Sequence, residues 1–201
     1  MPRPSTLPNP RFAEFAAALA AHPEWFKPRS GTFFRFQTTD FPGAKDILSG
    51  DGAKRRGGRW NRPGIAALYG STSDTTALEE SKANDRYYGI QTKSPRLLVA
   101  IEARLERIVD LTIPEIRRAL QYTLKASAAE DWRKVQQAGG ESDSQALGRA
   151  IATAGADGLL ARSSAVWAGV NVVVFPGPRT RDRLCVVEGE KLARLTKTPP
   201  A

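Results

Sequence analysis

With 201 residues, of which 41% are hydrophobic and 25% charged, the chain is long enough for one soluble domain with its own core or for two small ones. Its single cysteine, Cys185, excludes an internal disulfide, and one histidine beside it leaves too few nitrogen and sulfur ligands for a zinc site. A net charge of +9 and an isoelectric point of about 10.0 favour an anionic partner, such as nucleic acid, a phosphorylated ligand or an acidic protein.

The sequence also bears on location. No apolar run has the length of a membrane span, and the first four residues, Met-Pro-Arg-Pro, do not begin a signal peptide. A lone cysteine fits a reducing compartment. We therefore expect a cytoplasmic protein that holds no metal and contacts no membrane.

The first expected element is an alanine-rich helix over residues 10–21, which follows a proline-rich start. Phe12, Phe15 and Leu19 recur at helical spacing on one stripe, so this helix is expected to pack on the outside of the domain. Prolines at 23 and 28 end it.

Residues 32–36 form an aromatic segment that predicts a β-strand. Alternation points Phe34 and Phe36 to one side and Phe33 and Arg35 to the other. Because a buried guanidinium needs water or a partner, Arg35 stands either in solvent on an edge strand or in the lining of a cleft. The pattern leaves both possibilities open.

Residues 37–64 predict a long irregular connection, of the kind that is often functional or mobile. It contains Gly-Gly-Arg-Trp-Asn at 57–61. The glycines allow close approach of a ligand to the backbone, and Arg59 offers a fork of donors that suits phosphate oxygens. A plain surface turn is the alternative. A short strand over residues 65–70 follows, with Tyr69 on the same side as Ile65.

Residues 74–88 predict a helix that ends at Gly89, with Ser73 or Asp74 as its N-cap and a capping box between Thr76 and Glu79. Glu79 shares one stripe with basic residues, which indicates a solvated, ion-paired face. Glu80 lies instead on a stripe of small, weakly polar residues, which favours an inward carboxylate over a surface one.

The rest of the chain divides into further strands and helices. Strands are expected at 97–101, 105–109, 157–161, 170–175 and 184–187, and helices at 113–122, 128–137 and 144–154. The residues after 187 are expected to form a polar tail. The helical block carries no obvious chemistry, so it is expected to serve as scaffold or as a partner surface.

Five short motifs follow one another in a recognisable order. They are an aromatic strand with Arg35, Gly-Gly-Arg-Trp-Asn at 57–61, a strand ending in Tyr69, Thr-Ala-Leu-Glu-Glu at 76–80, and Gly-Leu-Leu-Ala-Arg-Ser at 158–163 before the strand of Asn171. This order resembles the RES domain, a family named for an arginine, a glutamate and a serine. Its members are the toxins of bacterial toxin–antitoxin pairs whose antitoxins are Xre-like.

The resemblance implies a fold and a domain division. The expected fold is α+β, a compact split β-sheet domain with flanking helices that is similar to ADP-ribosyltransferase toxins. A RES-like NAD-binding catalytic domain would occupy residues 31–190. Residues 1–30 would form an N-terminal proline-rich segment and helix, and residues 191–201 a tail.

The resemblance also implies an activity. Members of the family deplete NAD by hydrolysis or phosphorolysis of the nicotinamide–ribose bond, as an NAD glycohydrolase or phosphorylase, and some transfer ADP-ribose to a protein. NAD would therefore be the substrate, no metal would be required, and an Xre-like antitoxin would be the partner.

The family residues map onto this chain one by one. The catalytic set falls on Arg35, Glu80 and Ser163, with Ser164 as the alternative serine because the usual Pro-Ser pair reads Arg162-Ser163 here. The substrate-binding positions fall on Gly58, Arg59, Asn61, Tyr69 and Asn171.

Each residue type fits a step of that chemistry. Cleavage builds oxocarbenium-like charge on the ribose, which the carboxylate of Glu80 can stabilise. Arg35 and Arg59 can hold the pyrophosphate, Tyr69 can stack on the nicotinamide ring, and Ser163 can bind ribose or phosphate.

Two rival functions remain from the sequence. A nucleic-acid-binding protein would use the basic run at 54–56 together with Trp60, although direct nucleic-acid binding is not the favoured interpretation. A binding-only domain without catalysis is the other, motivated by the departure at Arg162.

Overall fold

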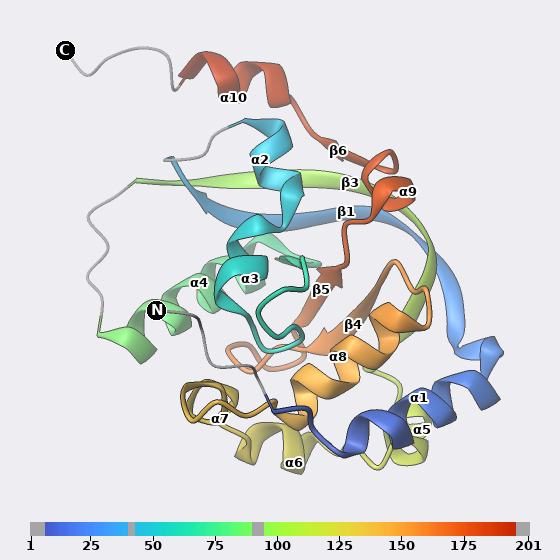
Figure 1. Cartoon of the computed structure of the whole chain (residues 1–201). Coiled ribbons are helices and arrows are strands. Elements are labelled where there is room, and N and C mark those ends of the chain that lie inside the picture. Colours follow the sequence, from blue (N-terminus) through green and yellow to red (C-terminus); the bar gives the residue numbers. More distant parts are fainter. Residues whose placement is uncertain (1–6, 40–42, 90–94, 196–201) are drawn as a thin grey trace.

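The computed structural model describes residues 7–39, 43–89 and 95–195, which form a single sheet surrounded by helices (Figure 1). The strands are β1 (Phe26–Thr38), β2 (Leu68–Ser71), β3 (Arg96–Asp110), β4 (Gly158–Arg162), β5 (Val170–Val174) and β6 (Leu184–Val186). The helices are α1 (Arg11–Ala21), α2 (Ala44–Ser49), α3 (Asp51–Arg56), α4 (Asp74–Tyr88), α5 (Pro114–Ala119), α6 (Leu124–Ala129), α7 (Trp132–Gln137), α8 (Asp143–Thr153), α9 (Pro178–Arg181) and α10 (Gly189–Leu195), with a 3₁₀ turn at Pro23–Trp25. The predicted α+β class is confirmed.

The sheet closes on itself. Its strand order is β1-β2-β5-β4-β3-β6, and β1 pairs in addition with β3, so the first five strands form a ring to which β6 is attached. All pairs are antiparallel except β3 with β4. Because successive side chains of a strand point to opposite sides, each strand of this ring supplies two different cores.

Strand β5 shows the division most clearly. Val173 is fully buried in one core together with Phe15 of α1 and Leu147 of α8. Its neighbour Val172 belongs to a second core, which includes Ile47 of α2. We call these two sides of the sheet the α8 face and the α2 face.

Several boundaries differ from the sequence prediction. The connection at 37–64 is not irregular throughout, because α2 and α3 lie within it. Gly50, with a φ of 69°, separates the two helices, so that neither is long enough to show a helical period in the sequence. Strand β1 begins at Phe26, within the expected N-terminal segment, despite Pro28 and Gly31.

The two strands predicted at 97–101 and 105–109 are one strand, β3, since Glu102 and Arg104 are exposed residues in an unbroken alternation rather than a turn. The helix predicted at 128–137 is instead two helices, α6 and α7, and the side chain of Asp131 caps the second. Residues 189–195, expected as part of a polar tail, form α10.

Helix α4 has the predicted bounds and ends at Gly89 in the left-handed conformation. Its N-cap is Ser73, whose side chain accepts a hydrogen bond from the Thr76 amide. The predicted capping box between Thr76 and Glu79 is wrong, because Glu79 binds Lys82 at 2.8 Å instead.

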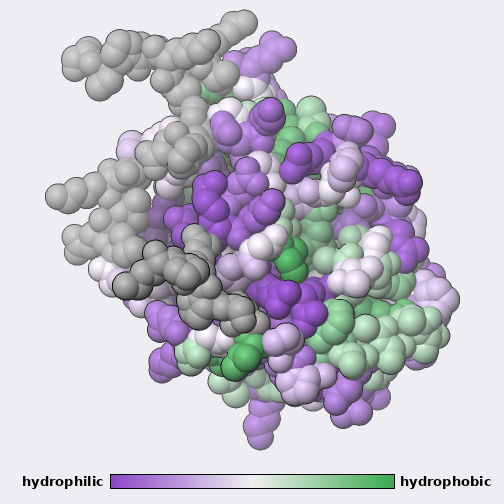
Figure 2. Space-filling model, in the orientation of Figure 1, coloured by the Kyte–Doolittle hydropathy of each residue, from purple (hydrophilic) through white to green (hydrophobic). Residues whose placement is uncertain are grey.

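The N-terminal helix is part of the main core. Phe15 and Leu19 are each 1% exposed, and α1 lies beside α8 (Figure 1). The exposed alanines of α1 account for the pale green surface at its position in Figure 2. The predicted stripe of α1 therefore faces α8 and the sheet.

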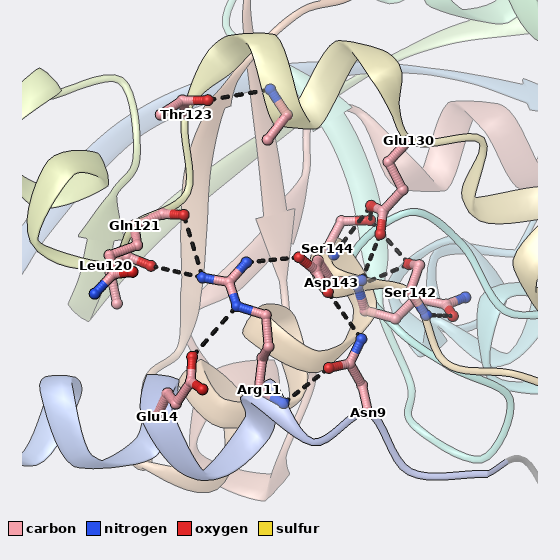
Figure 3. Close-up of polar contacts among 12 residues, drawn as sticks. Asn9, Arg11, Glu14, Leu120, Gln121, Thr123, Glu130, Ser142, Asp143 and Ser144 are labelled. Carbon is pink, nitrogen blue, oxygen red and sulfur yellow. Dashed lines mark hydrogen bonds and ion pairs between the residues drawn. The ribbon is translucent and has the colours of Figure 1, made fainter.

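Polar contacts hold the start of α1 against the start of α8 (Figure 3). Arg11 contacts Asp143 at 2.6 Å, and the side chain of Asn9 donates to Asp143 at 2.9 Å. The backbone amides of Asp143 and Ser144 donate to the carboxylate of Glu130, which therefore sits at the positive end of α8.

Glu141, just before α8, is the centre of a buried ion-pair network. Its side chain is 0% exposed and binds Arg149 at 2.7 Å through both oxygens, with Arg62 at 3.9 Å. The backbone amide of Asn9 donates to the carboxylate of Glu141 at 2.9 Å. One carboxylate thus connects the N-terminal segment, α8 and the loop after α3.

We expect Glu141→Ala to lower the free energy of unfolding by about 3–5 kcal/mol, because it leaves Arg149 buried without its counter-ion. Urea denaturation followed by circular dichroism measures the change. The matched control is Glu115→Ala, which removes a pair with Arg118 whose side chains are 68% and 71% exposed and should shift stability by less than about 1 kcal/mol. Equal effects of the two substitutions would contradict the assignment.

Candidate functional site

The glycine-containing loop at 57–61 is a closed turn. The amide of Gly58 donates to the carbonyl of Asn61 at 2.8 Å. The hydroxyl of Tyr69 accepts from the Trp60 amide at 2.9 Å and donates to the side chain of Asn61 at 2.7 Å. A Cβ at Gly58 would lie 2.5 Å from that hydroxyl, so only glycine fits there. Tyr69 therefore fixes the loop through its polar end, and burial raises the pKa of its hydroxyl.

Asn61 lies inside this turn. It is 0% exposed, and its amide nitrogen donates to the carbonyls of Ala53, Arg62 and Ile65 at 2.8–3.3 Å. Every polar atom of the side chain is thus bound within the protein. The structure places Asn61, for which substrate binding was predicted, where its side chain holds the loop.

Two glutamines from the helical block support the loop from behind. Gln145 of α8 is 0% exposed and donates to the carbonyl of Gly58 at 3.0 Å and to Gln136 at 2.7 Å. Gln136 in turn donates to the carbonyl of Arg56 at 2.9 Å. Neither glutamine was predicted from the sequence. The spacing Ser142-x-x-Gln145, which forms a capping box in the structure, was the available signal.

A second group of side chains meets at Glu80. Its oxygen Oε1 accepts hydrogen bonds from Ser163 at 2.6 Å and from Asn171 at 2.7 Å. The side chain of Asn171 accepts in turn from Ser71 at 2.8 Å. We call these four residues the carboxylate cluster. Helix α4, strand β2, strand β5 and the loop after β4 each contribute one member.

The cluster agrees with the orientation predicted for the two adjacent glutamates. Glu80 points to the sheet, whereas Glu79 pairs with Lys82, which lowers the pKa of Glu79. The second oxygen of Glu80, Oε2, has no hydrogen-bond partner among the residues that the structure describes. A partly buried carboxylate is therefore oriented through one oxygen and has the other available.

Of the two candidate serines, Ser163 is the one that contacts Glu80. The hydroxyl of Ser163 donates to Glu80 and accepts from the amides of Ala165 and Val166 at 3.1 and 3.0 Å, while Ser164 is exposed. The turn that follows presents Trp167, which is 96% exposed. Ser71 is the member of the cluster that the sequence analysis missed, since a serine at a strand end carries no distinctive pattern.

Arg35 lies on the other side of the sheet from the cluster. Its strand neighbour Phe34 is paired with Ser71, so those two side chains share a face, and Arg35 points to the α2 face beside Val99. Its guanidinium donates to Gln37 at 2.9 Å and to the carbonyl of Tyr69 at 3.4 Å. The structure thus joins Arg35 to strand β2 but not directly to Glu80.

The electrostatic state of Arg35 is unusual. Burial alone lowers the pKa of its guanidinium to about 10, and no carboxylate contacts it among the described residues. Arg59 is likewise bound only to a hydroxyl and a carbonyl, both of Ser127, at 3.2 Å. Each arginine therefore retains positive charge that the described protein does not neutralise, which suits an anionic ligand.

Other kinds of site find no support in the described ranges 7–39, 43–89 and 95–195. No group of three or more histidine, cysteine, aspartate or glutamate side chains there is arranged to hold a metal ion. No helix there has both the length and the apolar character needed to cross a membrane.

Comparison with known proteins places this arrangement in a family. A family model described as the RES domain matches residues 32–194. A chain in the crystal structure of the M. tuberculosis MbcT–MbcA toxin–antitoxin complex is similar in fold, with a TM-score of 0.63 and 22% sequence identity over 94% of this chain and 99% of that one. A search of curated proteins finds no match.

Replacing Arg35 by methionine tests whether its charge stabilises the fold. We expect the free energy of unfolding to stay unchanged or to rise by up to about 1 kcal/mol, since the substitution removes a desolvated cation that has no counter-ion among the described residues. The control is Arg96→Met, which removes an ion pair with Asp85 at 2.7 Å and should destabilise by about 1–3 kcal/mol. Thermal and urea unfolding measure both; a larger loss for Arg35→Met than for the control would show that Arg35 is a structural residue.

Proposed function

We propose that this chain, which belongs to the RES domain family, is the toxin of a toxin–antitoxin pair and cleaves NAD at the bond between nicotinamide and ribose. The observation that carries the proposal is the carboxylate cluster. Glu80 is held by Ser163 and Asn171 through one oxygen, and its other oxygen is available to a ligand. An oriented carboxylate of this kind suits a reaction in which positive charge develops on a sugar.

The reaction needs little proton transfer at the leaving group. When the bond from ribose C1′ to the pyridinium nitrogen breaks, both electrons go to nicotinamide, which leaves as a neutral molecule. The positive charge passes to the ribose, where the carboxylate of Glu80 stabilises it. An oxygen of water or phosphate then attacks C1′ and loses its proton to solvent. Because nicotinamide leaves as a neutral molecule without being protonated, the cleavage needs no second carboxylate as a general acid.

The hydrogen bonds to Glu80 serve this role by fixing its geometry. Ser163 and Asn171 hold the rotamer of the carboxylate, so no reorganisation is required as charge develops. Ser71 orients the amide of Asn171 so that its nitrogen, and not its oxygen, faces Glu80.

The rest of the dinucleotide is anionic, and the uncompensated arginines suit it. Arg59 is proposed to contact the pyrophosphate by exchanging its bonds to Ser127 for bonds to phosphate oxygens. The side chain of Arg35 points to the α2 face, so we propose that it contacts the part of the dinucleotide that extends past the end of β2 to that face. Tyr69 is partly exposed, which supports contact of its ring with a flat base even though its hydroxyl is bound to the loop. Gly58 leaves room for that hydroxyl against the loop backbone.

A protein partner is the second part of the proposal. The similar fold occurs in a solved toxin–antitoxin complex, and a net charge of +9 suits an acidic partner, for which we propose an Xre-like antitoxin. A toxin that consumes NAD would act in the cytoplasm, where its substrate is.

The nucleic-acid alternative loses one of its two supports. Residues 54–56 are exposed and basic, but Trp60 is only 5% exposed and packs edge-on against Tyr122 in the core. It therefore has no face on which a base can stack. Transfer of ADP-ribose to a protein uses the same cleavage step, so it stays an alternative that differs only in the acceptor.

The test compares two adjacent glutamates on α4. We expect Glu80→Gln to reduce NAD consumption at least ~100-fold, because the neutral amide cannot stabilise the ribose cation. Glu79→Gln is the matched control and should retain wild-type activity, since the partner of Glu79 within the described part of the chain is Lys82, at the surface. Both variants should melt within about 3 °C of the wild type. Loss of NAD in the Glu80→Gln protein at the wild-type rate would refute the proposal.

Product analysis identifies the acceptor. Purified protein incubated with NAD is expected to release nicotinamide, together with ADP-ribose in phosphate-free buffer or a phosphorylated ADP-ribose when phosphate is the acceptor. Mass spectrometry distinguishes the two, and ADP-ribose attached to the protein itself would indicate transfer. Intact NAD under all these conditions would count against an NAD-cleaving enzyme.

A further inference from the structure

A cavity of about 250 Å³ lies on the α2 face of the sheet, apart from the carboxylate cluster. Its walls include Phe33, Leu105, Leu160 and Val172, which are 3–6% exposed. None of these side chains takes part in the cluster or in the glycine-containing loop. The cavity is therefore a space with largely apolar walls, to which Ser30, Thr32 and Thr72 also contribute, and the proposed NAD reaction does not use it.

The strand register separates this cavity from the cluster. Thr72 lines the cavity and directly follows Ser71, and Val172 lines it and directly follows Asn171. Since consecutive residues of a strand point to opposite sides, the side chain of Val172 points away from that of Asn171. Glu80 and the residues that bind it are not part of the cavity lining.

One charged side chain stands at the cavity. Arg29 of β1 contributes to its lining and is paired in the sheet with Leu105, which lines it as well. The side chain of Arg29 has no hydrogen bond, ion pair or aromatic contact to any residue that the structure describes. An unpaired guanidinium beside an apolar space can bind a carboxylate in a bidentate manner.

The volume limits the size of the ligand. Sites for drug-sized molecules measure about 300–1,000 Å³, so a cavity of about 250 Å³ takes something smaller. We propose that it binds a small carboxylic acid with a short branched apolar tail, whose carboxylate pairs with Arg29 and whose tail contacts Leu160 and Val172.

The experiment titrates the full chain with 4-methylpentanoate, using calorimetry together with NMR of methyl groups. We expect saturable binding, with shifts at the methyls of Leu160 and Val172. The neutral 4-methylpentanamide should bind at least ~10-fold more weakly, because it cannot form the charge-assisted pair.

Substitutions on β1 and β3 provide matched variants. Arg29→Gln should weaken binding of the acid at least ~10-fold, and Arg29→Lys should restore part of it. Arg104→Gln is the control: Arg104 is exposed on the adjacent strand, but it does not line the cavity. It should bind as the wild type does. Arg29 is exposed, so its substitution should leave the fold intact.

Three results would overturn the inference. They are equal affinity for the acid and the amide, unchanged affinity in Arg29→Gln, and shifts at Leu159 and Val173 of the α8 face in place of their neighbours. Glu80→Gln, in contrast, should bind the acid with wild-type affinity, so this site can be verified whether or not the chain cleaves NAD.

Discussion

The pairing of β1 with β3 is the constraint on which the candidate site depends. It runs from Phe26 to Thr38 of β1, with one irregularity near Pro28, and it closes the sheet into a ring. Closure fixes the register of each strand, because a shift of one residue along the strand would move each of its side chains from one core to the other. The faces of Arg35, Ser71 and Asn171 are therefore determined by their positions in the register.

The loop at 57–61 illustrates a different source of order. Its glycines permit a tight turn but do not specify one, and a connection of this length would be free to move. What specifies the turn is a set of hydrogen bonds from residues distant in sequence: Tyr69 on β2 and Gln145 on α8. The helical block after residue 110, which shows no chemistry of its own, thus serves to hold the loop.

The sequence was sufficient to predict structure wherever the structure depends on residues that are close together in the chain. Helical spacing alone predicted α4 and the opposite orientations of Glu79 and Glu80, because the helix turns by about 100° per residue. It was insufficient where non-local pairing decides. The continuity of β3 and the participation of Ser71 and Gln145 all depend on partners far along the chain. Helices α2 and α3 are too short, with six residues each, to show a period.

The two kinds of charged residue in this site differ in what the fold does for them. The carboxylate of Glu80 receives two hydrogen bonds, so the protein compensates for its partial burial. Arg35 receives no counter-ion among the described residues, and desolvation lowers the pKa of its guanidinium. An apolar side chain of similar size would fit among Val99 and Phe33 without that penalty. A scaffold has no use for such an arginine, whereas a site for an anionic ligand does, because binding then supplies the missing charge.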